Sequence, residues 1–215
     1  MNHYNSTDLH QLDRIYRGNL INSVTGYKSA SLLATRSASG IDNVAIFSSV
    51  THLGSDPALF TFIQRPLGHG VGHTYENLKE TGHITLNHIN LELIERAHQS
   101  SAKYDASVSE FEVLGIESLD RDGIDAPFVK DAAIQVAARY EGEYYLKENK
   151  CILVLCRITD IFINDGIQQE DGWLNLETAG SLAINGLDAY ASGTTEKRLS
   201  YAKVGEELEE IKVSS

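Results

Sequence analysis

The chain has 215 residues, of which 42% are hydrophobic and 22% charged, and 30 acidic against 18 basic residues give a formal net charge of -12. This composition is typical of a globular protein with one core, and the negative field excludes nucleic acids and anionic membranes as general partners, since both require a basic face. The N-terminal stretch lacks the apolar core of a signal peptide, and no segment approaches about 20 apolar residues, so we expect a cytoplasmic protein.

Taken in chain order, the hydrophobic pattern predicts one helix followed mainly by strands. Apolar residues recur near helical spacing across residues 8–21, which indicates a short amphipathic helix. Apolar or alternating runs bounded by turn residues then predict strands at residues 30–37, 43–50, 58–64, 83–89, 111–119, 133–146 and 150–164. This succession without βαβ alternation favours a closed antiparallel sheet over a doubly wound nucleotide-binding fold.

Two further helices and a C-terminal extension complete the expected organisation. A helix at residues 74–82 would start at Thr74 as its N-cap and end at Gly82, and a second would span residues 91–102. Residues from about 174 to 215 have weak periodicity, so we expect them to wrap the outside of the barrel or to reach a partner subunit. No linker, repeat or low-complexity segment is visible, and residues 1–215 are predicted to form a single domain.

Cys151 and Cys156 lie five residues apart in an apolar run that is typical of a strand. Because side chains alternate between the faces of a strand, the two thiols are expected on opposite faces, where they suit neither a disulfide nor a paired metal site. They are therefore interpreted as buried strand cysteines.

The stretch RPLGHGVGHTYEN, residues 65–77, combines features of an anion site. If Thr74 caps the following helix, the first backbone N–H groups and the positive end of the helix dipole face whatever precedes it. Arg65 adds a planar cation suited to phosphate, and Asn77 adds an amide donor. An ordinary strand, turn and capped helix, with Arg65 paired to a surface carboxylate, is also compatible with this stretch.

Other site chemistries are not favoured by this stretch. It contains neither GxGxxG within a βαβ unit nor GxxxxGK[ST], and the chain has no GxSxG elbow. His69 and His73 are four apart, but the glycines between them disfavour a helix and no third ligand has suitable spacing, so no metal site is expected.

A second polar group follows a turn in the stretch GIDNVAIFSSV. Asn43 stands at the start of a predicted strand, and Ser48 and Ser49 stand at its far end. Such groups beside exposed backbone amides suit a flat polar ring rather than an ion, although residues that cap an edge strand would show the same pattern.

Several short segments in a fixed order resemble the flavin-reductase-like FMN-binding split-barrel proteins, a group that includes flavoredoxin-like proteins. The resemblance covers roughly residues 17–190, and it rests on the segments GIDNVAIFSS, SDPAL, RP, HTYENL, TGHITLN, SSAKYDASVSEFE, APFVKDAA, DGWLN and NGLDAY. The sequence departs from the family pattern at Ser29, where a proline is common. The resemblance implies a mainly β, antiparallel split β-barrel of Greek-key type with a few short flanking helices, and a homodimer with non-covalent FMN near the subunit interface.

The resemblance also implies roles for individual residues, which are carried over by position. The residues expected around the FMN phosphate are Arg65, His73, Thr74 and Asn77. Those expected along the isoalloxazine ring are Asn43, Ala45, Ser48 and Ser49. Those expected to border the pocket or the subunit interface are Lys103, Ser109, Glu110 and Tyr190.

The implied activity is that of an NAD(P)H-dependent flavin reductase, in which hydride passes through flavin N5 and no protein nucleophile is needed. NADH or NADPH would be the electron donor, and a flavin-using monooxygenase or another electron acceptor would be a partner. An FMN-binding electron carrier without reductase turnover is the alternative, and an oxidase of the pyridoxamine phosphate type is a more remote one.

Overall fold

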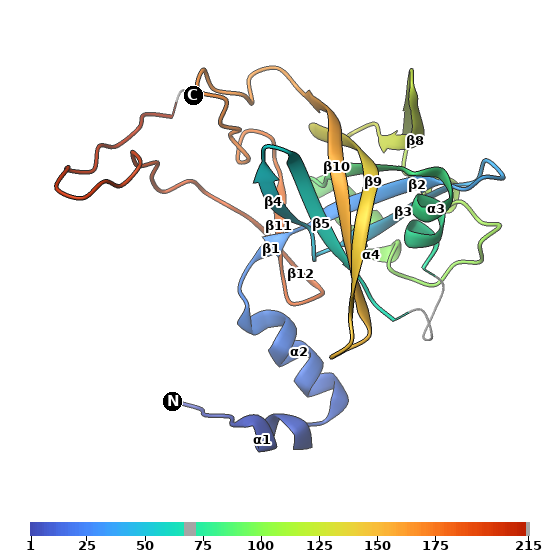
Figure 1. The fold of residues 1–215 in the computed structure, drawn as a ribbon, viewed down its shortest axis with the longest axis horizontal. Helices are drawn as coiled ribbons and strands as arrows, with labels where there is room; N and C mark the ends of the chain where they lie inside the picture. Colours follow the sequence, from blue (N-terminus) through green and yellow to red (C-terminus); the bar gives the residue numbers. More distant parts are fainter. Residues whose placement is uncertain (67–71, 214–215) are drawn as a thin grey trace.

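The computed structural model describes residues 1–66 and 72–213. A strongly curved antiparallel sheet forms the body of the molecule, and the N-terminal helices and the C-terminal segment both project from it (Figure 1). No helix among the described residues has both the length and the apolar character needed to cross a membrane.

The main sheet has seven strands in the order β3-β2-β6-β9-β10-β5-β4, with every neighbouring pair antiparallel. The strands are β2 (Ser31–Arg36), β3 (Asp42–Phe47), β4 (Thr51–Ser55), β5 (Ala58–Gln64), β6 (His83–His88), β9 (Ile134–Leu146) and β10 (Cys151–Ile163). Residues 48–50 join the two edge strands β3 and β4, and three residues span only about 10 Å. The sheet must therefore curl until its edges approach each other.

Smaller elements cover the ends and faces of this sheet. One additional sheet has the order β1-β11-β12, and β7 pairs with β8. These strands are β1 (Lys28–Ser29), β7 (Ser118–Arg121), β8 (Ile124–Val129), β11 (Leu182–Asn185) and β12 (Ala189–Ser192). The helices are α1 (Ser6–Gln11), α2 (Arg14–Val24), α3 (His73–Thr81), the 3-10 helix η2 (Leu91–Leu93), α4 (Ile94–Gln99) and α5 (Glu110–Leu114).

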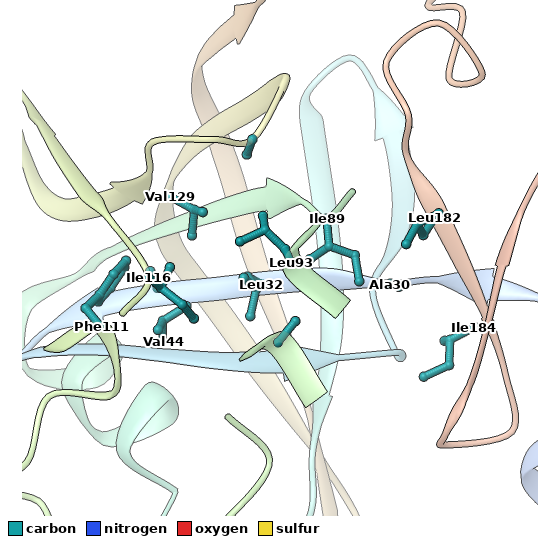
Figure 2. Packing of buried hydrophobic residues seen from close by; sticks show 13 residues of the cluster. Ala30, Leu32, Val44, Ile89, Leu93, Phe111, Ile116, Val129, Leu182 and Ile184 are labelled. Atoms are coloured by element: carbon teal, nitrogen blue, oxygen red, sulfur yellow. The ribbon is translucent and has the colours of Figure 1, made fainter. Parts of the chain in front are cut away.

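The central strand β2 explains why the core has two parts. Leu32 and Leu33 are both fully buried, and because they point to opposite faces they belong to different clusters. Figure 2 shows Leu32 in the cluster that also holds Val44 and Phe111. Leu33 packs in the other cluster, with Phe62 from β5. Burial on both faces makes β2 the strand around which the other elements are placed.

The strand predicted at residues 111–119 is wrong in its first half. Residues 110–114 form α5, Gly115 ends this helix with a φ of 64°, and the strand β7 begins only at Ser118. Phe111 is buried while Val113 is 54% exposed, so the apolar residues of this run do not all face the core. A short helix places Phe111 inward and leaves Val113 in solvent.

The first predicted helix is also divided. Residues 8–21 fall in two helices, because Asp13 accepts hydrogen bonds from the backbone N–H groups of Ile15 and Tyr16 and so starts α2. The end of α3 is as predicted: Gly82 has a φ of 77°, and its N–H donates to Leu78 O at 2.9 Å.

Both cysteines lie on β10 and both are free thiols. Cys156 is fully buried, and this burial raises the pKa of its thiol to about 12. Cys151 is only half-buried, so the prediction of a buried cysteine is confirmed for Cys156 and is wrong for Cys151. Cys151 lies at the first position of the strand, where the sheet meets solvent.

His88 links the main sheet to the segment that leads into β11. Its Nδ1 lies 2.9 Å from Ser181 Oγ, and desolvation lowers the pKa of His88 to about 4, below the value of about 6.5 for an unfolded histidine. The unfolded chain therefore binds more protons between these two values, and the stability contributed by neutral His88 is lost as the pH falls from about 6.5 towards 4.

We expect the free energy of unfolding to show this titration. Between pH 7.5 and pH 5, the wild type should lose about 2 kcal/mol relative to His88→Gln, which has no titrating imidazole at this position. Urea unfolding of both proteins at several pH values measures the difference. Parallel pH profiles for the two proteins would contradict a partly buried His88 that stays neutral in the folded protein.

Candidate functional site

The buried side chain of Asn43 lies at the centre of a polar network. Asn43 is 5% exposed; its Oδ1 accepts from Thr74 Oγ1 at 2.9 Å and from Thr35 Oγ1 at 3.4 Å. Its Nδ2 donates to Glu110 Oε2 at 2.9 Å. Asn77 Nδ2 in turn donates to Thr35 Oγ1 at 3.2 Å. The network thereby connects β2, β3, α3 and α5.

The direction of hydrogen-bond donation in the network can be followed from its one backbone donor, the Val44 N–H. The Val44 N–H points to Glu110 Oε2 at 3.4 Å, so this oxygen acts as an acceptor. The amide of Asn43 must then present its Nδ2 to Glu110 and its Oδ1 to the two threonine hydroxyls. Donation therefore runs from α3 and β2 through Asn43 to the carboxylate of Glu110.

The N-terminus of α3 differs from the prediction for Thr74. The helix begins at His73 with Gly72 as its N-cap, and no side chain caps it. Thr74 is 4% exposed and directs its hydroxyl to Asn43, so the predicted capping role is wrong. The physical reason is the position of Thr74 on the face of α3 that packs on the sheet, one turn before the buried Leu78.

A cavity of about 130 Å³, lined by both polar and apolar residues, lies beside this network and against α3. Its lining residues are Ser37, Ser39, Ile41, Asn43, His73, Glu76, Asn77, Ala106 and Val108. His73, Glu76 and Asn77 share one face of the helix because of their spacing. His73 Nε2 is buried and has no hydrogen-bond partner among the described residues.

The first turn of α3 has free hydrogen-bonding capacity. The N–H groups of Tyr75 and Glu76 both donate to Gly72 O at 2.9 Å. The preceding N–H groups, those of His73 and Thr74, lie before the first intrahelical bond, and no acceptor for them is found within residues 1–66 and 72–213. Together with the helix dipole, these N–H groups favour a negatively charged or polar ligand.

The sheet edge carries the other predicted cofactor-binding residues. Ala45 is half-buried on β3, and Ser48 and Ser49 follow that strand. Ser49 Oγ accepts from the Ile63 N–H at 3.1 Å and so ties the β3–β4 connection to β5. Arg65 is exposed just after β5, and no ion pair with it is found in the described part of the chain.

The residues predicted to border the pocket or interface fall into two places. Glu110 and Ser109 lie at the start of α5, where Ser109 Oγ is buried without a partner among the described residues. Lys103 is exposed in the preceding loop. Tyr190 lies elsewhere: its hydroxyl is 3.1 Å from His98 Nδ1, and both line a shallower cavity of about 300 Å³ between α4 and β12.

Thr35 is the network residue that was not predicted, although the sequence contains a signal for it. Arg36 and Asp42 flank the β2–β3 turn and form an ion pair at 2.6 Å. Arg36 and Asp42 are opposite each other in the β2–β3 ladder, and the next pair in that register is Thr35 opposite Asn43. His69, the other half of the histidine pair, lies outside the described residues.

The comparisons with known proteins agree on one family. The profile of the flavin reductase like domain matches residues 27–185. A candidate flavin reductase with a split-barrel domain from Shewanella frigidimarina has 37% identity and a TM-score of 0.90, over 94% of this chain and 100% of that chain. No curated protein sequence matches this chain.

More distant structures share the fold. Nitrilotriacetate monooxygenase component B from Bacillus cereus has 17% identity and a TM-score of 0.81, over 93% of this chain and 98% of that chain. An FMN-binding protein from Thermus thermophilus has 14% identity and a TM-score of 0.64, over 79% of this chain and 88% of that chain. The profile match over most of the chain, together with the Shewanella frigidimarina structure, shows that this protein belongs to the flavin reductase like family and has its antiparallel split-barrel fold.

Proposed function

We propose that this protein binds FMN non-covalently and acts as a flavin reductase-like oxidoreductase with NADH or NADPH as the electron donor. The observation that carries the proposal is the N-terminal end of α3 in a chain of the flavin reductase like family. Two N–H groups there, which have no acceptor among the described residues, adjoin the cavity of about 130 Å³. The Thermus thermophilus relative is described as FMN-binding, which supports FMN as the flavin. Use of a pyridine nucleotide would place the activity in the cytoplasm.

The proposed phosphate site uses the backbone more than the side chains that the sequence indicates. The N–H groups of His73 and Thr74 would donate to the phosphate, and the guanidinium group of Arg65 would add a positive charge and paired N–H donors. The hydroxyl of Thr74 and the amide of Asn43 already bond each other, so these side chains would hold the backbone in place rather than contact the ligand. Asn77, at the cavity, bonds Thr35 with its amide nitrogen, and no donor to its carbonyl oxygen is found among the described residues.

The flavin ring is proposed to lie along the β3–β4 connection. FMN, when bound, supplies hydride transfer through its N5 position. The backbone at Ser48 and Ser49 would donate to the polar edge of the ring, and Ala45 would give it a small apolar neighbour on β3. The bond from the Ile63 N–H to Ser49 holds this connection in place before any ligand arrives.

An electron carrier without its own reductase turnover remains the second candidate. The Bacillus cereus relative is named as a component of a monooxygenase. If this protein is a reductase, that name supports a flavin-using monooxygenase as its electron acceptor. Anaerobic stopped-flow mixing of the FMN-loaded protein with NADH or NADPH decides between the two. We expect rapid bleaching of the flavin absorbance; no bleaching with either nucleotide would favour the carrier.

We expect Arg65→Ala to weaken FMN selectively. Loss of a charge-assisted hydrogen bond to phosphate is worth roughly 1.5 to 3 kcal/mol, which corresponds to about tenfold to a hundredfold in affinity. Riboflavin lacks the phosphate and should bind both proteins equally. Arg139, an exposed arginine on β9, provides the matched control in Arg139→Ala. Equal losses for both flavins, or none, would contradict the assignment of Arg65.

A homodimer is proposed on two observations. The cavity of about 130 Å³ is smaller than the roughly 300 to 1,000 Å³ of typical ligand pockets, so a second subunit would complete the site. No residue of α1 or α2 is buried, and Ile21 and Val24, which share one face of α2, are 45% and 69% exposed. Short helices are only marginally stable in water unless an apolar face is packed against another surface, and a second copy of the chain would cover the apolar face of α2. The C-terminal segment, with Tyr201 at 89% exposure, is proposed to take part.

We expect light scattering to give twice the 23.7 kDa mass of one chain at micromolar concentration. The double substitution Ile21→Asp with Val24→Asp places two charges on one exposed apolar face of α2 and should shift the protein towards monomer. Asn19→Asp adds a charge to an already polar, exposed position of the same helix and should leave the dimer intact. A monomeric wild type, or a dimer unaffected by the double substitution, would contradict this interface.

A further inference from the structure

Glu110 is a buried acidic residue at the start of α5. It is 3% exposed, and no lysine, arginine or histidine of the described residues forms an ion pair with it. Carboxylates are rarely buried in this way unless specific donors satisfy them. Its donors are the Asn43 amide at 2.9 Å and the Val44 N–H at 3.4 Å, both to the same oxygen.

The place of Glu110 is well defined by the packing of its neighbours. Phe111, the next residue, is 4% exposed and belongs to the same hydrophobic cluster as Val44, as Figure 2 shows. This contact holds α5 against β3 and brings the Glu110 carboxylate under Asn43. Since α5 has only five residues, tertiary packing rather than helix propensity maintains it.

The effect of Glu110 reaches α3 through Asn43. A carboxylate accepts hydrogen bonds and cannot donate them, so it makes Asn43 present its nitrogen to Glu110 and its oxygen to Thr74. Thr74 is the second residue of α3, and no acceptor for its N–H or for that of His73 is found within residues 1–66 and 72–213. The orientation of one amide therefore decides whether the start of α3 is held against β3.

We infer that Glu110 is a positioning residue: through the Asn43 amide it holds the first turn of α3 where the backbone N–H groups meet the flavin phosphate. The inference rests on the proposed function, and it concerns a group that does not touch the ligand itself. It differs from a purely structural role, which would affect stability but would not distinguish a phosphorylated flavin from an unphosphorylated one.

Glu110→Ala tests this role by titration with FMN and with riboflavin. Leaving the buried Asn43 amide without its acceptor releases the restraint on Thr74, and we expect FMN affinity to fall about tenfold or more. Riboflavin affinity should change much less. Glu112→Ala is the matched control, because Glu112 is on the same helix but exposed, and it should bind both flavins like the wild type.

Conservative variants separate the hydrogen bond from the charge. Both donors reach a single oxygen of Glu110, so the carbonyl oxygen of Glu110→Gln can accept them and should restore selective FMN binding. Thr74→Val removes the link at the other end and should reproduce the loss seen in Glu110→Ala, whereas Thr74→Ser should not. If Glu110→Ala does not fold, the comparison of Thr74→Val with Thr74→Ser tests the positioning role instead.

The outcomes are distinguishable from failure of the proposed function. A wild type that binds neither flavin would overturn the flavin site itself. A wild type that binds FMN, with Glu110→Ala or Thr74→Val showing unchanged FMN affinity or equal losses for both flavins, would overturn only the positioning role. Loss of FMN selectivity in Glu110→Ala and Thr74→Val, with recovery in the two conservative variants, supports it.

Discussion

The buried amide of Asn43 is the constraint on which the candidate site depends. An amide enclosed in a protein interior is costly unless its donors and acceptor are satisfied, and here the partners come from three other elements. Thr35 approaches from β2, Thr74 from α3 and Glu110 from α5. Satisfying one side chain therefore sets the relative positions of four elements, and the cavity lies beside Asn43, between the β2–β3 turn, α3 and the loop before α5.

In this arrangement the side chains and the backbone have different roles. Side chains that look like ligand-binding groups, such as those of Asn43 and Thr74, are used to hold elements together. The backbone at the start of α3 remains free of intramolecular partners within the described residues, and it offers directional donors without any loss of side-chain freedom. A rigid set of donors of this kind suits a site that must hold a cofactor in one orientation.

The barrel and its surroundings differ in how they are stabilised. The body buries large apolar side chains on both faces of β2, for example Leu32 and Leu33. By contrast, α1 and α2 bury none, and the segment after β12, residues 193–213, has no buried residue and contacts the body through interactions such as the stacking of Arg198 on Trp173 at 4.2 Å. These peripheral parts have the exposed apolar side chains that an assembly of two chains would cover.

The sequence by itself determined the strands β2, β3, β5, β6, β9 and β10, and the end of α3, because apolar runs and a glycine with positive φ act locally. It also indicated the family, and with it Asn43, His73 and Asn77, three of the residues that line the cavity. Only the tertiary structure decided that residues 110–114 are helical, that Thr74 turns its hydroxyl to Asn43, and that β11 and β12 join β1. Each of these depends on contacts between residues far apart in the chain, which local periodicity cannot encode.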